Sequence, residues 1–181
     1  RLCGFERPSA GKIDCQGTSA KDRLVVFWAP PQQGLWPHLS VREHLTTVSP
    51  DRSHQAVCES NRLLEKFDLL IHAEARPDTL SLGERSRLNV ARALCSKAGV
   101  LVMDEPLAHV DFARSTRYWE TIRDECASIG ASLIFSTHSP DVVLREAEHV
   151  VCLAEGRVSF SGHVIDLYER PSSPDLATLL G

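Results

Sequence analysis

The sequence predicts an α/β fold with a mostly parallel sheet, and three observations support this prediction. Val100–Met103 is a continuous apolar run, which is typical of a parallel strand covered on both faces. Strand-like and helix-like segments alternate through the middle of the chain, as they do in strand–helix–strand units. Gly130 and the pair Ser139-Pro140 supply helix stop and start signals between these segments.

The first half of the chain is predicted to contain two strands and then helices. A short strand is expected around Lys12–Cys15, and the apolar run Leu24–Phe27 predicts a buried strand. Residues 29–40 are expected to be irregular because they contain several prolines and a glycine. From Val41 to Ile71 apolar residues recur at helical spacing, and a loop through Arg76–Asp78 follows.

The second half is predicted to alternate helices and strands. Ser81 and Glu84 fit the capping box that begins a helix. The later elements are expected, in order, as a helix at Ser115–Ser128, a strand at Ala131–Ser136, a helix from Ser139-Pro140, and a hairpin of His149–Leu153 and Arg157–Phe160 around Glu155-Gly156.

Length and composition fit one globular domain with a real core. The chain has 181 residues, of which 43% are hydrophobic and 24% charged. The net charge of -4 argues against nucleic acid as an obligate partner, because phosphate binding normally needs a basic face. The cysteines and histidines are scattered without metal-ligand spacing, so no zinc site is predicted. No apolar run is long enough to span a bilayer and no leader is evident, although a chain that begins at Arg1 is expected to be a fragment or processed.

Side chains that could bind a metal ion or transfer a proton follow two of the predicted strands. Asp104 and Glu105 end the strand Val100–Met103, and ligands of open parallel sheets bind at the carboxyl ends of strands. One carboxylate could hold Mg²⁺ and the other could orient or deprotonate water, while a solvated strand end is the alternative. His138 follows the next strand and could hydrogen-bond a phosphate oxygen, with a structural histidine as the alternative.

The start of the helix at Ser81 is a second candidate site. Unpaired N–H groups and the positive end of the helix dipole favour an anion there, and Gly83 allows close approach of the backbone. The alternative is a capping box with no ligand.

The order and spacing of these motifs closely resemble the ATP-binding-cassette (ABC) family. The segments that match the family's signature motif, Walker B strand, D-loop and switch histidine are Leu80–Glu84, Val100–Pro106, Val110-Asp111 and Ser136–His138. The segments Arg1–Gly17 and Leu35–Glu43 are also similar to the family, and Leu167–Gly181 resembles the end of importer-type ATPase subunits.

The resemblance implies a P-loop NTPase-like fold with an inserted helical subdomain at about 41–96 and antiparallel strands at the ends. It also implies a single ABC ATPase domain over residues 1–181 that lacks its N-terminal part. ATP and Mg²⁺ are the implied cofactors. The implied roles are Mg²⁺ binding for Asp104, action on the hydrolytic water for Glu105, γ-phosphate contact for His138, contact with ATP held by the opposite subunit for Ser81 and Gly83, and communication across the dimer for Asp111.

The implied function is an ATP-hydrolysing subunit of an ABC transporter. Two such subunits would face head to tail, and hydrolysis would drive solute transport through separate membrane permease subunits. The implied location is cytoplasmic, peripheral on the inner face of the membrane. The alternatives are a degenerate or truncated, non-hydrolysing interaction module and a soluble ABC ATPase outside transport. The transported substrate, and import as against export, stay open.

The sequence departs from the family pattern in several places. It contains no G-x-x-x-x-G-K-[ST] loop, so N-terminal truncation is expected and the chain as given is expected to be inactive. Leu82 replaces a signature glycine, and Glu84 stands where glutamine is commoner. Trp28 occupies the place of the expected Q-loop glutamine, for which Gln32 or Gln33 could substitute.

Overall fold

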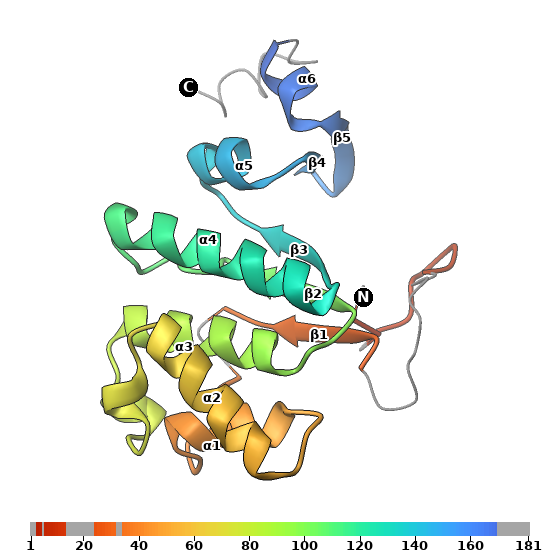
Figure 1. Cartoon of the computed structure of the whole chain (residues 1–181). Coiled ribbons are helices and arrows are strands. Elements are labelled where there is room, and N and C mark those ends of the chain that lie inside the picture. Colours follow the sequence, from red (N-terminus) through yellow and green to blue (C-terminus); the bar gives the residue numbers. More distant parts are fainter. Residues whose placement is uncertain (1–2, 5, 14–23, 32–33, 170–181) are drawn as a thin grey trace. The chain divides into compact units, whose positions relative to one another are not determined.

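The computed structural model describes residues 3–4, 6–13, 24–31 and 34–169. The chain divides into two compact units, Arg1–Ser136 and Thr137–Gly181 (Figure 1). Each unit is described by itself. That the whole of 1–181 is a single domain stays a prediction.

The first unit is built on a parallel three-stranded sheet in the order β1-β2-β3. These strands are Val26–Ala29, Val100–Asp104 and Ser132–Ser136. The parallel sheet is therefore confirmed. The expected strand around Lys12–Cys15 is not: Lys12 and Ile13 lie in no strand, and residues 14–15 are outside the described part of the chain.

Strand β1 begins two residues later than the apolar run predicts. Leu24 and Val25 precede it, and their carbonyls accept hydrogen bonds from Gly99 N (3.0 Å) and Val100 N (2.9 Å). Their side chains remain exposed, so the apolar run marks the approach to the strand as well as the strand.

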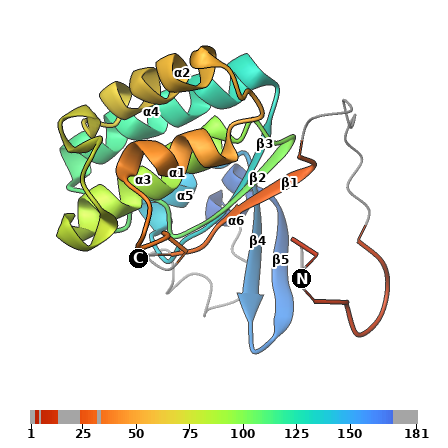
Figure 2. The same cartoon turned by 90° about the horizontal axis from the view of Figure 1, so that it is seen from below.

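Four α-helices lie on one side of this sheet (Figure 2). They are α1 (Val41–Val48), α2 (His54–Lys66), α3 (Leu82–Cys95) and α4 (Phe112–Ile129), with short 3₁₀ turns at Leu70–His72 and Pro77–Thr79. The predicted helical stretch Val41–Ile71 is interrupted after α1 ends at Val48. A second helix then begins at His54, where the Ser53 hydroxyl accepts from Gln55 N at 3.1 Å and caps it. Residues 41–96 contain no strand, although their identity as a subdomain stays a prediction.

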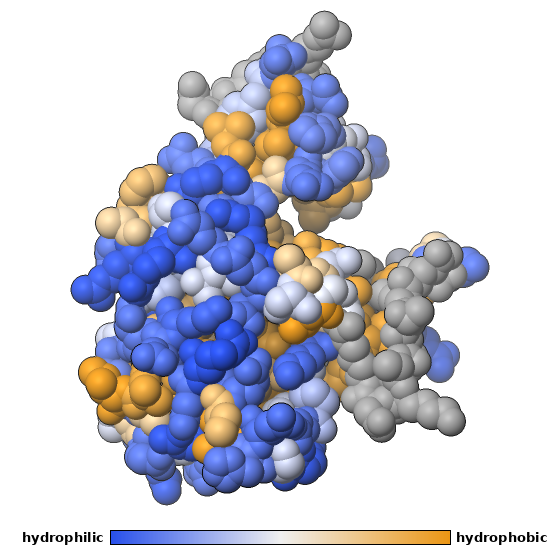
Figure 3. Space-filling model, in the orientation of Figure 1, coloured by the Kyte–Doolittle hydropathy of each residue, from blue (hydrophilic) through white to orange (hydrophobic). Residues whose placement is uncertain are grey.

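Helix α3 is the centre of the packing. All ten residues from Ser86 to Cys95 are buried. Large side chains of the neighbouring elements close around it, and those with almost no exposed surface include Leu45, Leu63, Leu64, Phe67, Leu101, Met103, Tyr118, Trp119 and Ile122. By contrast, α4 buries one side and presents a mostly hydrophilic outer surface (Figure 3).

The two faces of the sheet differ in burial. Leu101 and Met103 are buried, and Trp119 of α4 packs on Phe135 of β3 with ring centroids 4.9 Å apart. On the opposite face Trp28 is 40% and Ile134 45% exposed. Within this unit α1–α4 all lie on one side of the sheet, and coverage of Val100–Met103 on both faces stays a prediction.

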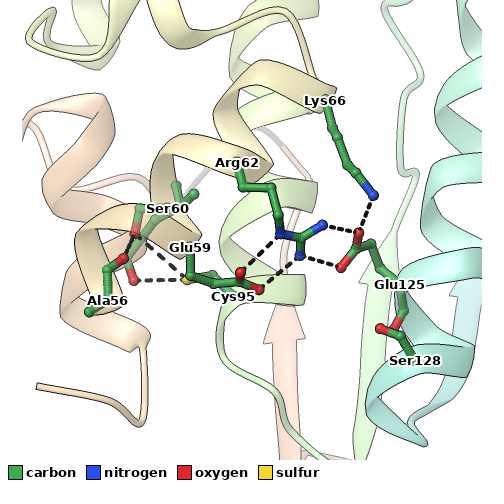
Figure 4. A network of polar contacts seen from close by, with 9 residues as sticks. Ala56, Glu59, Ser60, Arg62, Lys66, Cys95, Glu125 and Ser128 are labelled. Atoms are coloured by element: carbon green, nitrogen blue, oxygen red, sulfur yellow. Dashed lines mark hydrogen bonds and ion pairs between the residues drawn. The ribbon is translucent and has the colours of Figure 1, made fainter. Parts of the chain in front are cut away.

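An ion-pair network joins α2 to α4 (Figure 4). Both oxygens of the buried Glu125 carboxylate accept from Arg62, at 2.6 and 2.7 Å, and Lys66 Nζ lies 2.7 Å from one of them. Glu59 holds the other edge of the Arg62 guanidinium. Hydrogen bonds from Arg62 and Lys66 lower the pKa of Glu125 to about 2, so this carboxylate is charged at neutral pH.

The second unit contains α5 (Pro140–Glu146), β4 (His149–Ala154), β5 (Arg157–His163) and α6 (Val164–Glu169). The predicted hairpin is confirmed: β4 and β5 are antiparallel, and Glu155 and Gly156 both have positive φ, as a two-residue type I′ turn requires. Pro140 starts α5 as predicted, but the Ser139 side chain makes no capping hydrogen bond.

Candidate functional site

Asp104 and Glu105 lie at the carboxyl end of β2, where the sequence predicts them. Asp104 pairs with Ser136 across the sheet, and the Ser136 hydroxyl donates to the Asp104 carboxylate. The Glu105 N–H donates to the Ser136 carbonyl at 3.1 Å. These two contacts with β3 set the positions of both acidic residues. Because both residues are half-buried, their side chains keep access to solvent.

Glu105 opens a tight turn that returns the chain to helix α4. Glu105 has a φ of 47° and Leu107 a φ of 63°, in the left-handed region that side chains rarely adopt. Ala108 N donates to the Glu105 carbonyl (3.3 Å) and Val110 N to the Leu107 carbonyl (3.0 Å). Such backbone strain gathers at functional sites and persists only where the surroundings hold it.

The cavity beside this turn is small. It measures about 10 Å³ and lies between the turn and the α3 residues Ser86, Asn89 and Val90. That is about the room of a single water molecule, so the cavity itself does not hold a nucleotide.

Asp111 closes the turn as the N-cap of α4. One carboxylate oxygen accepts from Arg114 N at 3.0 Å, and the other lies 3.5 Å from Arg114 Nε. Within this chain Asp111 is therefore a helix cap, and its side chain remains exposed.

The predicted capping box of α3 is confirmed and involves more contacts than the sequence motif indicates. Glu84 N donates to the Ser81 hydroxyl at 3.3 Å, while Ser81 N and the Ser81 hydroxyl donate to Glu84 Oε2 at 2.8 and 2.7 Å. These bonds, the one from the hydroxyl first, lower the pKa of Glu84. A carboxylate thus already occupies the anion-favouring end of α3, with His72 Nε2 3.2 Å from its other oxygen.

Gly83 brings this helix end against the turn. A Cβ placed on Gly83 would lie 2.8 Å from the His109 carbonyl oxygen. The structure therefore places the helix end that carries Ser81 and Gly83 beside the turn that runs from Glu105 to Asp111.

The remaining predicted residues lie outside the described part of the first unit or away from its acidic turn in sequence. His138 belongs to the second unit, where it is exposed just before α5. Gln32 and Gln33 are outside the described residues, and Trp28 lies within β1.

Two residues of α3 that the sequence did not single out hold the segment after β1. Arg92, 3% exposed, donates to the Gly34 carbonyl and lies over the Trp36 ring at 4.9 Å. Burial lowers the pKa of the Arg92 guanidinium to about 10. Asn89 donates to the Pro30 carbonyl. Arg92 lies among the apolar residues of a helix that the sequence predicts, and this could have marked it as a buried arginine with a specific partner. Only the fold shows what Arg92 contacts.

Two observations concern only the part of the chain that the structure describes. There, no three His, Cys, Asp or Glu side chains gather as a metal-binding group. None of the described helices has both the length and the apolar character of a membrane span.

Comparison with protein families matches residues 1–108 to the ABC transporter model. The chain belongs to the ABC transporter family. It is 32% identical to the molybdenum import ATP-binding protein ModC of Methylococcus capsulatus, over 96% of this chain and 51% of that protein. It is 30% identical to the spermidine/putrescine import ATP-binding protein PotA of Acidothermus cellulolyticus, over 99% of this chain and 49% of that protein.

The chain spans about half the length of these curated ABC relatives. A solved ABC transporter structure in an inward-facing conformation matches with a TM-score of 0.75 and 21% identity, over 99% of this chain and 70% of that one. This likeness concerns the fold, and it confirms the predicted P-loop NTPase-like ABC architecture.

Proposed function

We propose that the chain is part of an ATP-binding, ATP-hydrolysing subunit of an ABC transporter. The observation that carries the proposal is the pair Asp104 and Glu105 at the carboxyl end of β2, tied to β3 through Ser136. The relatives named ModC and PotA are import ATP-binding proteins, which supports a role in solute uptake. Hydrolysis in a head-to-tail dimer would be coupled to separate membrane permease subunits, at the inner face of the membrane.

Asp104 is the residue proposed to hold Mg²⁺. The carboxylate of Asp104 and the hydroxyl of Ser136 adjoin, and this all-oxygen set fits a hard cation that one or two carboxylates usually bind together with phosphate and water. When bound, Mg²⁺ supplies neutralisation of charge on the β- and γ-phosphates of ATP.

Glu105 is proposed to orient and deprotonate the attacking water, which suits a carboxylate that a strained turn holds next to Asp104. His138 is proposed to contact the γ-phosphate. Gln32 or Gln33 is proposed as the Q-loop glutamine.

Ser81, Gly83 and Asp111 are proposed to act across a dimer of nucleotide-binding domains. Ser81 and Gly83 would meet ATP held by the opposite subunit, and Asp111 would communicate between the two sites. Leu82, adjacent to Ser81, is 48% exposed and Phe112, adjacent to Asp111, is 71% exposed. Large apolar side chains exposed at this edge support a surface that a partner covers.

A second candidate is an interaction module that does not hydrolyse ATP. The 181 residues contain no G-x-x-x-x-G-K-[ST] loop, whose N–H groups and lysine hold the phosphates of ATP. The retained Asp104, Glu105 and His138 favour the ATPase over this candidate.

The deciding experiment measures MgATP binding and hydrolysis by two polypeptides. One is this chain, and the other is a chimera in which a Walker A segment from one of the curated relatives precedes Arg1. We expect the chimera to bind and hydrolyse ATP and this chain to do neither. A chimera that folds but does not bind MgATP would favour the interaction module and remove the catalytic roles proposed above.

A further inference from the structure

Gly83 makes an unusually close contact with the turn that carries Glu105. It lies in the first turn of α3, and a Cβ there would meet the His109 carbonyl oxygen at 2.8 Å, closer than real Cβ atoms come to their neighbours. The helical backbone at this position does not itself require glycine, since alanine is the better helix former. The close approach of the turn is what excludes a side chain.

The same turn rests on α3 at a second point. Leu107 is 4% exposed, and the turn and the α3 residues Ser86 and Val90 line the same small cavity. At its start, the turn is held by the hydrogen bond from Glu105 N to the Ser136 carbonyl. The strained backbone of Glu105 and Leu107 is therefore fixed by β3 on one side and by α3 on the other.

We propose that Gly83 is a positioning residue for Glu105. By lacking a side chain, Gly83 lets the His109 carbonyl seat against α3, and this contact sets the path of the turn from Glu105 to Val110. The role is exerted within one chain and is separate from any contact of Gly83 with a nucleotide of a second subunit. Its catalytic consequence rests on the proposed function, whereas the positioning of the turn does not.

The first test is structural and uses this chain as it stands. Gly83→Ala is compared with Gly99→Ala, in which the new Cβ would lie 3.4 Å from its nearest neighbour, Val25 O, an ordinary contact. Backbone amide chemical shifts of residues 105–111 are measured by NMR. We expect Gly83→Ala to move these shifts and Gly99→Ala to leave them unchanged. Unchanged shifts in a folded Gly83→Ala chain would overturn the proposal.

A second measurement covers the case in which Gly83→Ala does not fold. In the unsubstituted chain, nuclear Overhauser effects between the Gly83 α-protons and protons of Ala108–Val110 are expected, because the His109 carbonyl lies against Gly83. Their absence would show that the turn does not rest on α3 and would refute the inference without any variant.

The kinetic test uses the ATP-hydrolysing chimera. Gly83→Ala is expected to lower kcat by about 10- to 100-fold, as small misplacements of catalytic groups do. Adding His109→Gly, which makes the turn more adaptable, is expected to restore part of kcat. A raised KM with an unchanged kcat would show that Gly83 acts only through its proposed contact with ATP and does not position Glu105. A chimera that hydrolyses no ATP would refute the proposed function alone, since the NMR test stands without it.

Discussion

At the scale of single residues, contacts with β3 place the acidic pair. Asp104 ends a strand and receives the Ser136 hydroxyl, while Glu105 is held in a left-handed conformation by its own N–H bond to β3. The two carboxylates are adjacent in sequence yet differ in backbone conformation. This difference suits the separate roles proposed for them, cation binding and action on water.

Glu105→Gln tests the role of the second carboxylate. In the chimera, we expect ATP binding to remain and hydrolysis to fall by at least about 100-fold, because the amide cannot accept a proton from water. The ATP-bound dimer should then accumulate, which size-exclusion chromatography with and without MgATP would detect. Hydrolysis at an unaltered rate would remove Glu105 from the mechanism.

At the scale of elements, α3 connects the parts of the proposed site. Its start carries the Ser81–Glu84 capping box, its first turn seats the His109 carbonyl, and its buried Arg92 and Asn89 hold the segment after β1. Because α3 is buried over most of its length, a displacement at one of these contacts is resisted by close packing around the others.

Ser81→Ala separates the capping role of this residue from its proposed role in catalysis. Loss of the cap is expected to cost about 1 kcal/mol of unfolding free energy, measured by urea denaturation of this chain. In the chimera, hydrolysis should slow while ATP affinity of the monomer is unchanged. A large loss of monomer affinity would place Ser81 in the site of its own subunit.

The substitution Glu125→Gln tests the ion-pair network that joins α2 to α4. The Glu125 pKa of about 2 lies below the ordinary value of 4.5, so the stabilisation is complete above pH 4.5 and is lost as the pH falls towards 2. At pH 7, Glu125→Gln is expected to lower the unfolding free energy by about 1–3 kcal/mol. The gap between the variant and the unsubstituted chain should narrow progressively below pH 4.5.

The control is Glu120→Gln, which removes an exposed carboxylate from the same helix. It is expected to change the unfolding free energy by no more than about 0.5 kcal/mol. Equal effects of the two substitutions at pH 7 would show that the network adds nothing to stability.

At the scale of the whole molecule, the proposed chemistry is divided between chains. The carboxylates of one subunit and the Ser81 end of α3 from the other would complete each site. Mixing two impaired chimeras, Glu105→Gln and Ser81→Ala, tests this arrangement. The mixed dimer contains one site in which both residues are intact, so activity is expected to rise above that of either variant alone. If both residues act within one chain, mixing restores nothing.

Much of the fold and of the candidate site could be predicted because the signals are local. Helix caps, the Gly130 stop, the Glu155-Gly156 turn and the strand that ends at Asp104 each depend on residues a few positions apart. The order of the motifs along the chain was enough to indicate the ABC family, which the family model then confirmed.

The tertiary structure alone decided how these local pieces meet. Ser136 reaches Asp104 across 32 positions and Arg92 reaches Gly34 across 58, and no local pattern specifies such pairs. The start of β1 depended on its pairing with β2, and the uneven burial of the sheet depended on which face the helices cover. The seating of His109 on Gly83 belongs to the same class, because a glycine's purpose is visible only when the neighbour that excludes its side chain is in place.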